Sequence, residues 1–265
     1  MRKRKINLWG WLWILIGVSY FFVPMIGTFE FSLRAKKGEL SLLAYQRVLQ
    51  DPNFIRTFSF SIGMGVLTII ASLLLIAPTV YWVRLRLPKL RPVLEFISLM
   101  PFVVPAIVLV FGLIRVYSGG LLSLTNTVVG TDVLLVGAYM VLALPYMFRA
   151  VDTGLRAIDV RTLTEAALSL GAGWRIILFQ VIFPNLRVAI LSGVFLTFAI
   201  VMGEFTFASL LSWPAFGPYI EEMGSMRAYV PQALSVISFL MTWISIGVIQ
   251  RIGRGAPGQE VAGAH

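Results

Sequence analysis

The sequence predicts an all-α, polytopic membrane protein with six transmembrane helices and one large cytoplasmic loop. Hydrophobic residues make up 58% of the 265 residues and charged residues 13%, whereas soluble domains average roughly 45–50% and about 25%. So few charges could not cover the surface of a soluble protein of this length, which excludes the soluble enzyme classes. The chain has no cysteine, which excludes disulfides and thiolate metal sites.

Six apolar runs are each close to the roughly 20 residues that a helix needs to cross a bilayer. They are Leu8–Phe31, Phe58–Val83, Val93–Val116, Val129–Phe148, Val188–Leu211 and Tyr229–Ile249. None alternates in polarity as a membrane β-strand does. The first run is too long for the apolar core of a signal peptide and no small-residue cleavage site follows it, so we expect a retained helix.

The distribution of lysine and arginine predicts the orientation. Fifteen of the 22 lie on the side that carries both termini and seven on the other. The richer side is expected to be cytoplasmic, so both termini are expected to lie in the cytoplasm. This asymmetry also explains the formal charge of +10 without a nucleic-acid partner.

The segments between the runs complete the expected organisation. Residues 1–57 are expected to form an N-terminal transmembrane helix and external loop, residues 58–250 the main membrane domain, and residues 251–265 a disordered cytoplasmic tail. The external loop contains a helix-like stretch, Leu40–Phe54, and a second external loop at 212–228 is rich in turn formers.

The long inner loop, Arg149–Arg187, has helical periodicity and contains the most informative motif. Long ordered loops tend to be functional. Its motif reads Glu165-Ala166-Ala167, then Gly171, then Val181-Ile182-Phe183-Pro184. Glu165 sets a charge on a helix face, the two alanines leave room for close approach, Gly171 permits a sharp turn, and Pro184 is expected to end a second short helix. On these grounds alone an ordinary amphipathic surface helix is the simpler interpretation.

The same segment resembles the EAA loop of bacterial ABC importer permeases. That pattern is E-A-A, three residues, G, nine residues and I-x-L-P, and here Val181 and Phe183 replace the Ile and the Leu. The stretches Ala143–Tyr146 and Met100–Pro105 are also similar to that family. The likeness covers most of residues 40–250, and the chain is identified as a member.

The resemblance implies a solute pathway that works with other chains. These are two ABC ATPase subunits, a second permease subunit that is a different chain, and an extracytoplasmic substrate-binding protein. It implies that the loop contacts the ATPase through Glu165, Ala166, Ala167, Gly171 and Pro184. ATP and Mg²⁺ would be bound by the ATPase, and this chain would need no cofactor. The sequence agrees, because it has no phosphate-binding loop and its single histidine, His265, is the last residue, so an enzyme is not expected.

The substrate is less well defined. Glu204 lies well inside the fifth run, where a carboxylate is costly and usually faces a cavity or a partner. It is expected to line the pathway and favour a cationic solute, although it could instead pair with a cation of the partner permease or accept a helix hydrogen bond. Residues 195–213 are most similar to the spermidine/putrescine permease group, but Gly203 replaces one of the two acids of that group.

Other functions remain open at this point. Related permeases for aminoethylphosphonate, ferric iron, thiamine or sulfate are similar enough to be alternatives. A secondary transporter would show paired intramembrane ionisable groups or inverted repeats, and neither is visible. A non-transporting membrane scaffold would explain the apolar runs but not the spacing of the loop motif.

Overall fold

The structure is a computed structural model that describes residues 8–119 and 123–253. Every regular element in these two ranges is a helix. The chain divides into two compact units: one comprises residues up to Ile55 together with Ile220–Met241, and the other comprises Arg56–Tyr219 and the residues from Thr242 onwards. The predicted C-terminal tail overlaps the last helix at residues 251–253, and its remainder lies outside the described residues.

The first unit contains α1 (Leu8–Ser32), α2 (Leu43–Gln50) and much of α13 (Val230–Gly253). Large apolar side chains are exposed along the whole of α1, the pattern of a helix that lipid or another membrane helix covers. Ser32 at its end shares a hydrogen bond of 2.7 Å with the Tyr45 hydroxyl of α2. The helix expected over Leu40–Phe54 is shorter than predicted, because Asp51 is extended and a new helix begins at Pro52.

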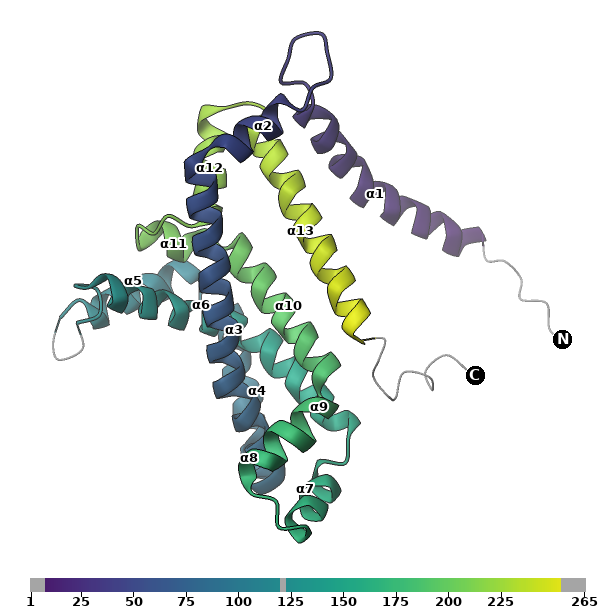
Figure 1. Cartoon of the computed structure of the whole chain (residues 1–265), viewed down its shortest axis with the longest axis vertical. Helices are drawn as coiled ribbons and strands as arrows, with labels where there is room; N and C mark the ends of the chain where they lie inside the picture. The colour runs from purple at the N-terminus through teal and green to yellow at the C-terminus, as the bar shows by residue number, and fades with distance from the viewer. Residues whose placement is uncertain (1–7, 120–122, 254–265) are drawn as a thin grey trace. The chain divides into compact units, whose positions relative to one another are not determined.

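The second unit is built around three long helices. These are α3 (Pro52–Arg86), which begins in the first unit, α6 (Val128–Ala157) and α10 (Arg187–Gly203). Helices α6 and α10 lie side by side (Figure 1). A Cβ added to Gly154 of α6 would stand 2.6 Å from the Ala189 Cβ of α10, so only glycine permits this approach. Close packing through small residues is how membrane helices associate.

The structure partly confirms the predicted spans. Within the described residues, α1, α3 and α6 are long and apolar enough to cross a membrane, and two bent helix pairs raise the number to five if each pair is one span. The sixth predicted span corresponds to α13, of which Val230–Ser245 is a shorter apolar helix. The count of six therefore stays a prediction.

The third and fifth predicted runs are not single helices. The third consists of α4 (Arg91–Val103) and α5 (Ala106–Tyr117), which are bent by 102°. Val104 between them is extended, as expected for a residue that precedes a proline. The fifth run ends its helix at Gly203 and continues as α11 (Thr206–Leu210). The loop predicted at 212–228 contains another helix, α12 (Phe216–Met226).

Candidate functional site

The predicted docking loop is a compact group of short helices. It comprises α7 (Val160–Ser169), α8 (Trp174–Ile176), a π-helical stretch η2 (Ile177–Ile182) and α9 (Phe183–Asn185). These helices gather at one end of α3 and α6, in the lower part of Figure 1. Helix α7 follows α6 after only two residues, so the loop continues directly from a membrane helix.

The start of α7 is fixed by a side-chain cap. The Asp159 carboxylate accepts hydrogen bonds from the Thr162 hydroxyl at 2.7 Å and from the Thr162 backbone N–H at 3.1 Å. These bonds favour the charged form and lower the pKa of Asp159, the bond from the Thr162 hydroxyl most of all. The cap therefore stabilises α7 at neutral pH and is lost as the pH falls through that lowered pKa.

The exposed face of α7 carries the predicted Glu165. Its Oε1 accepts a hydrogen bond from Arg161 Nε at 2.8 Å, one helical turn earlier. This bond raises the pKa of Arg161. Both side chains are exposed, so the pair adds little to stability, and it leaves an acid and a base side by side on an open surface.

The two predicted alanines point in different directions. Ala166 is exposed, but Ala167 is only 7% exposed and packs in the hydrophobic core beneath α7. The two side chains differ because residues adjacent in a helix lie about 100° apart around its axis; the close approach at Ala167 is to the core of this chain, and its role at the ATPase contact stays a prediction. Leu170 is 87% exposed and extends the outward face beyond the end of α7.

Gly171 makes the sharp turn that the sequence predicts. Its φ is 78°, a left-handed conformation that residues with a Cβ rarely adopt. The backbone N–H of Gly171 donates to the Leu168 carbonyl at 2.9 Å, and that of Ala172 donates to the Ala167 carbonyl at 3.0 Å. These two bonds form a Schellman motif, the usual way to close a helix with glycine.

Pro184 lies next to the end of the second helical segment. The segment runs from Trp174 to Asn185 and meets α10 at an angle of 81°. The helix therefore ends one residue after the predicted proline. The widened π turns of η2 precede Pro184, where a proline ring would clash with the carbonyl four residues earlier in a regular α-helix.

Contacts with α3 hold the loop against the membrane helices. The Tyr81 hydroxyl lies 2.8 Å from Thr164 Oγ1, and both side chains are buried. Thr164 also donates to the Val160 carbonyl at 2.6 Å, so its single proton is used and Tyr81 is the donor. Trp82 of α3 contacts Trp174 of α8 with ring centroids 4.7 Å apart. These contacts fix the inner face of the loop and leave its outer face open.

The sequence analysis did not single out Tyr81, Thr164 or the Trp82–Trp174 contact. A buried threonine four residues after the start of an amphipathic helix is a weak signal, and the partners are far apart in the sequence. Only the fold brings them together.

Glu204 lies at the break between α10 and α11, not within a continuous helix. Its carboxylate is buried and accepts hydrogen bonds from the Phe207 backbone N–H at 2.9 and 3.0 Å and from the Ala208 N–H at 3.3 Å. One of the three roles considered for Glu204, acceptance of helix hydrogen bonds, is therefore present. The roles in the pathway and in pairing with a partner permease stay predictions.

The segment after α11 folds back against α3. The Phe216 backbone N–H donates to Ser61 Oγ at 2.8 Å, and the Trp213 ring stacks on Phe60 with centroids 5.3 Å apart. A membrane interior offers no water to these polar groups. The acceptors Glu204 and Ser61 therefore satisfy backbone N–H groups that the breaks in the helices leave unpaired.

These features define a class, an all-helical membrane protein in which a folded helical loop joins two packed spans. Residues 84–253 match the family of binding-protein-dependent transport system inner membrane components, and the chain belongs to that family. It is therefore a permease subunit of an ABC importer in a bacterial inner membrane and not an enzyme.

Relatives with curated functions carry substrate names. The chain is 28% identical over 226 residues to the spermidine/putrescine transport system permease protein PotB of Escherichia coli, covering 78% of each chain. The same protein of Haemophilus influenzae is 28% identical over 175 residues, which span 62% of this chain and 60% of that protein. A probable sulfate transport system permease of Prototheca wickerhamii is 27% identical over 206 residues, or 75% of this chain and 79% of the relative.

Solved structures support the fold. The chain resembles a bacterial ABC transporter involved in the import of the acidic polysaccharide alginate, with a TM-score of 0.62, 19% identity and coverage of 95% of this chain and 98% of the other. It also resembles the MetNI methionine ABC transporter in its inward-facing conformation, with a TM-score of 0.59, 18% identity and coverage of 76% and 94%.

Proposed function

We propose that the loop from α7 to α9 is the element through which ABC ATPase subunits drive this permease. The observation that carries the proposal is the division of α7 into two faces. Val160, Thr164 and Ala167 anchor one face in the core, while Glu165 and Ala166 lie open on the other. A segment packed this firmly on α3 and α6 would move with them as a rigid body when the ATPase displaces it. Such a continuous chain of packed contacts is what coupling requires.

The remaining partners follow from this proposal. Two ATPase subunits would supply ATP hydrolysis and hold ATP and Mg²⁺, a second and different permease chain would complete the pathway, and an extracytoplasmic binding protein would deliver the solute. The loop must then lie on the cytoplasmic side, together with both chain termini, as the distribution of lysine and arginine predicts.

A polyamine, or another small cationic solute, is the proposed substrate. Support comes from the spermidine/putrescine permeases among the relatives. The alternative with a specific observation in its favour is sulfate, because one relative is a probable sulfate permease. The buried Glu204 carboxylate is the acid that would attract a cation, although it already accepts backbone hydrogen bonds.

Cross-linking tests the coupling proposal. In the assembled complex, Ala166→Cys is expected to cross-link to the ATPase through a heterobifunctional thiol reagent, since Ala166 is exposed on α7. Ala167→Cys is the matched control: it differs by one position, but its side chain is buried, and it should react poorly. The natural chain has no cysteine, so each variant carries a single thiol. Equal cross-linking of both variants, or of neither, would contradict the docking role of this face.

A labelling experiment tests the orientation. A membrane-impermeant thiol reagent should label Leu40→Cys in intact cells, and it should label Leu170→Cys only after the membrane is permeabilised. Both positions are well exposed, at 69% and 87%, so a difference between them reports sidedness and not burial. Labelling of both variants in intact cells would show that the proposed topology is wrong.

A further inference from the structure

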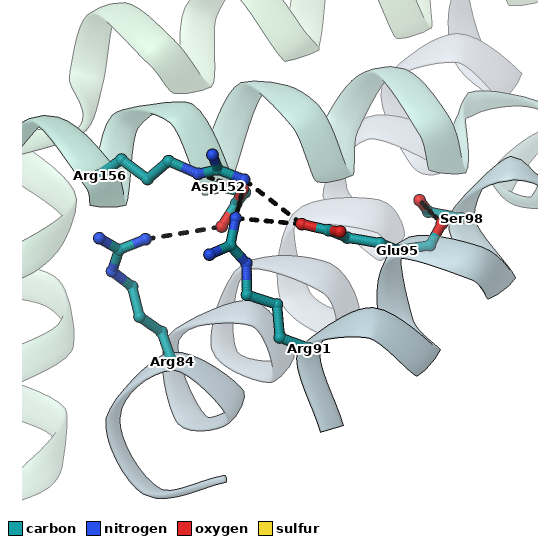
Figure 2. A network of polar contacts seen from close by, with 6 residues as sticks. All are labelled: Arg84, Arg91, Glu95, Ser98, Asp152 and Arg156. Carbon is teal, nitrogen blue, oxygen red and sulfur yellow. Dashed lines mark hydrogen bonds and ion pairs between the residues drawn. The ribbon is translucent and has the colours of Figure 1, made fainter. Parts of the chain in front are cut away.

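Five charged side chains link the ends of α3, α4 and α6 next to the loop (Figure 2). Asp152 and Arg156 lie in the last turns of α6, Arg84 near the end of α3, and Arg91 and Glu95 in the first turns of α4. None of them belongs to the EAA motif, and the proposed function so far gives them no role.

Asp152 is the centre of this network. Arg156 reaches its Oδ2 with Nη2 at 2.6 Å and with Nε at 2.8 Å, Arg91 Nη2 lies 3.3 Å from the same oxygen, and Arg84 Nη1 lies 3.7 Å from Oδ1. The Asp152 side chain is only 8% exposed. A buried carboxylate is stable only when it is paired, so Asp152 draws three guanidinium groups from three helices to one point.

Glu95 is the second acid of the network. Its Oε1 lies 3.0 Å from Arg91 Nη2 and 3.3 Å from Arg156 Nη2. Arg91 of α4 and Arg156 of α6 therefore each contact both carboxylates. A guanidinium group, with several donors in one plane, is suited to such bridging contacts. The first turns of α4 are thus tied to the end of α6 by two acids and two bases that are mutually linked.

Apolar packing attaches this end of α4 only weakly. Ser98 is the one buried residue of α4, and large side chains such as Phe96 and Ile97 are exposed. In contrast, α3, α6 and α7 share a hydrophobic core that includes Tyr81, Leu155 and Val160, to which α4 adds the partly buried Leu94. The charged network is therefore a major part of what holds the beginning of α4 in place.

We propose that Asp152 is a positioning residue for transport. It holds the first turns of α4 against α6, so that a displacement of the docking loop moves the bent pair of α4 and α5 together with α6. Asp152 and Arg156 lie within two turns of the point where α6 leads into α7, so the charged network lies beside the docking loop. This inference rests on the proposed coupling function of that loop.

The first experiment tests whether Asp152 holds α4 in place, in the absence of ATP hydrolysis. Ser98→Cys introduces a single thiol at a buried position of α4 that faces α6 and lines a cavity of about 320 Å³ together with Glu95 and Asp152. In the assembled complex without ATP, adding Asp152→Asn should make this thiol react several-fold faster, because the end of α4 loosens. Glu39→Gln, which removes a similar acid from an exposed pair with Lys36, is the matched control and should not change the rate.

The consequence is tested by the number of solute molecules imported per ATP hydrolysed. Asp152→Asn should lower this ratio at least about twofold, the lower end of effects seen for mutations that modulate coupling. Arg91→Lys, which keeps the cation, should retain more of the ratio than Arg91→Gln. Arg91→Gln also serves if Asp152→Asn fails to assemble, because it removes only one of the three cations around the buried acid.

Two results would overturn the inference: an unchanged thiol reaction rate, or a faster reaction with an unchanged transport ratio. Failure of the coupling proposal itself would look different. A permease that carries Ala166→Cys and an intact charged network would then show no cross-link to the ATPase, while the thiol at position 98 would still report whether Asp152 holds α4.

Discussion

Gly171→Val is expected to abolish import while the permease remains in the membrane and the ATPase continues to hydrolyse ATP. A left-handed φ costs a residue with a Cβ about 1–2 kcal/mol of conformational free energy, and it costs a residue with a β-branched side chain more. Apart from Gly171 and its two neighbours in the chain, no heavy atom lies within 4 Å of the position that a Cβ would occupy at Gly171, so the effect comes from the backbone alone. The turn would open and the exposed end of α7 would change direction at the proposed ATPase contact.

A matched substitution separates this effect from a general loss of stability. Gly173 is two residues further on, also has free space around its Cβ position, and has an ordinary φ of −75°. Gly173→Val should therefore import solute nearly normally. Gly171→Asn should be milder than Gly171→Val, since asparagine tolerates the left-handed region better. The measurements are uptake and ATP hydrolysis by the reconstituted complex, and normal uptake by Gly171→Val would rule out the role of this turn in coupling.

Much of the loop could be predicted from the sequence because its signals are local. A glycine that follows a short amphipathic helix predicts a left-handed turn, and Gly171 has one. A proline near the end of the second helix predicts a change of direction, and the chain bends by 81° after Pro184. The burial of Ala167 could not be predicted, because the side of α7 that packs depends on Tyr81 and Ile177, which the spacing of the motif does not reveal.

The predicted spans show what hydropathy cannot predict. Hydropathy measures how well a segment suits the bilayer and does not register where the backbone breaks. The break between α10 and α11 falls inside a run that is apolar on both sides of Glu204. Similarly, α6 continues to Ala157, nine residues beyond the predicted end at Phe148, because a helix persists after its apolar residues end. Of the two breaks within predicted spans, at Val104–Pro105 and at Glu204, only the bend near Pro105 carries a local signal.

Only part of the charged network could be recognised in the sequence. Asp152 and Arg156 form a recognisable i,i+4 pair, but Arg84 and Arg91 come from segments more than 60 residues earlier. Counting charges assigned these arginines to membrane orientation, and orientation remains a sufficient reason for their presence on that side. Only the packing of α3 and α4 against α6 shows that the same arginines surround a buried acid.

The replacement of Glu204 by glutamine is expected to leave the complex assembled and to reduce uptake of spermidine more than uptake of a neutral solute. Glutamine has nearly the same size and keeps one oxygen that can accept the Phe207 N–H, which Glu204 accepts at 2.9 Å. It removes the negative charge, so a hydrogen bond to a charged acceptor becomes one to a neutral acceptor, at a cost of about 1 kcal/mol in folding stability. If uptake of a cation falls further than this loss of stability explains, the additional decrease must arise from the missing charge in the solute pathway.

Glu204→Ala is the companion variant, because it removes both the charge and the hydrogen-bond acceptor. Burying the N–H groups of Phe207 and Ala208 without an acceptor costs about 1–3 kcal/mol each, so this variant should lose uptake of every solute as the break between α10 and α11 rearranges. Thermal unfolding of the purified complex and uptake of both solutes are measured together. If Glu204→Gln assembles and takes up spermidine at the normal rate, Glu204 is a structural cap and does not select the substrate. If the complex falls apart with glutamine alone, the charge pairs with the second permease, as an acid at an interface between subunits would.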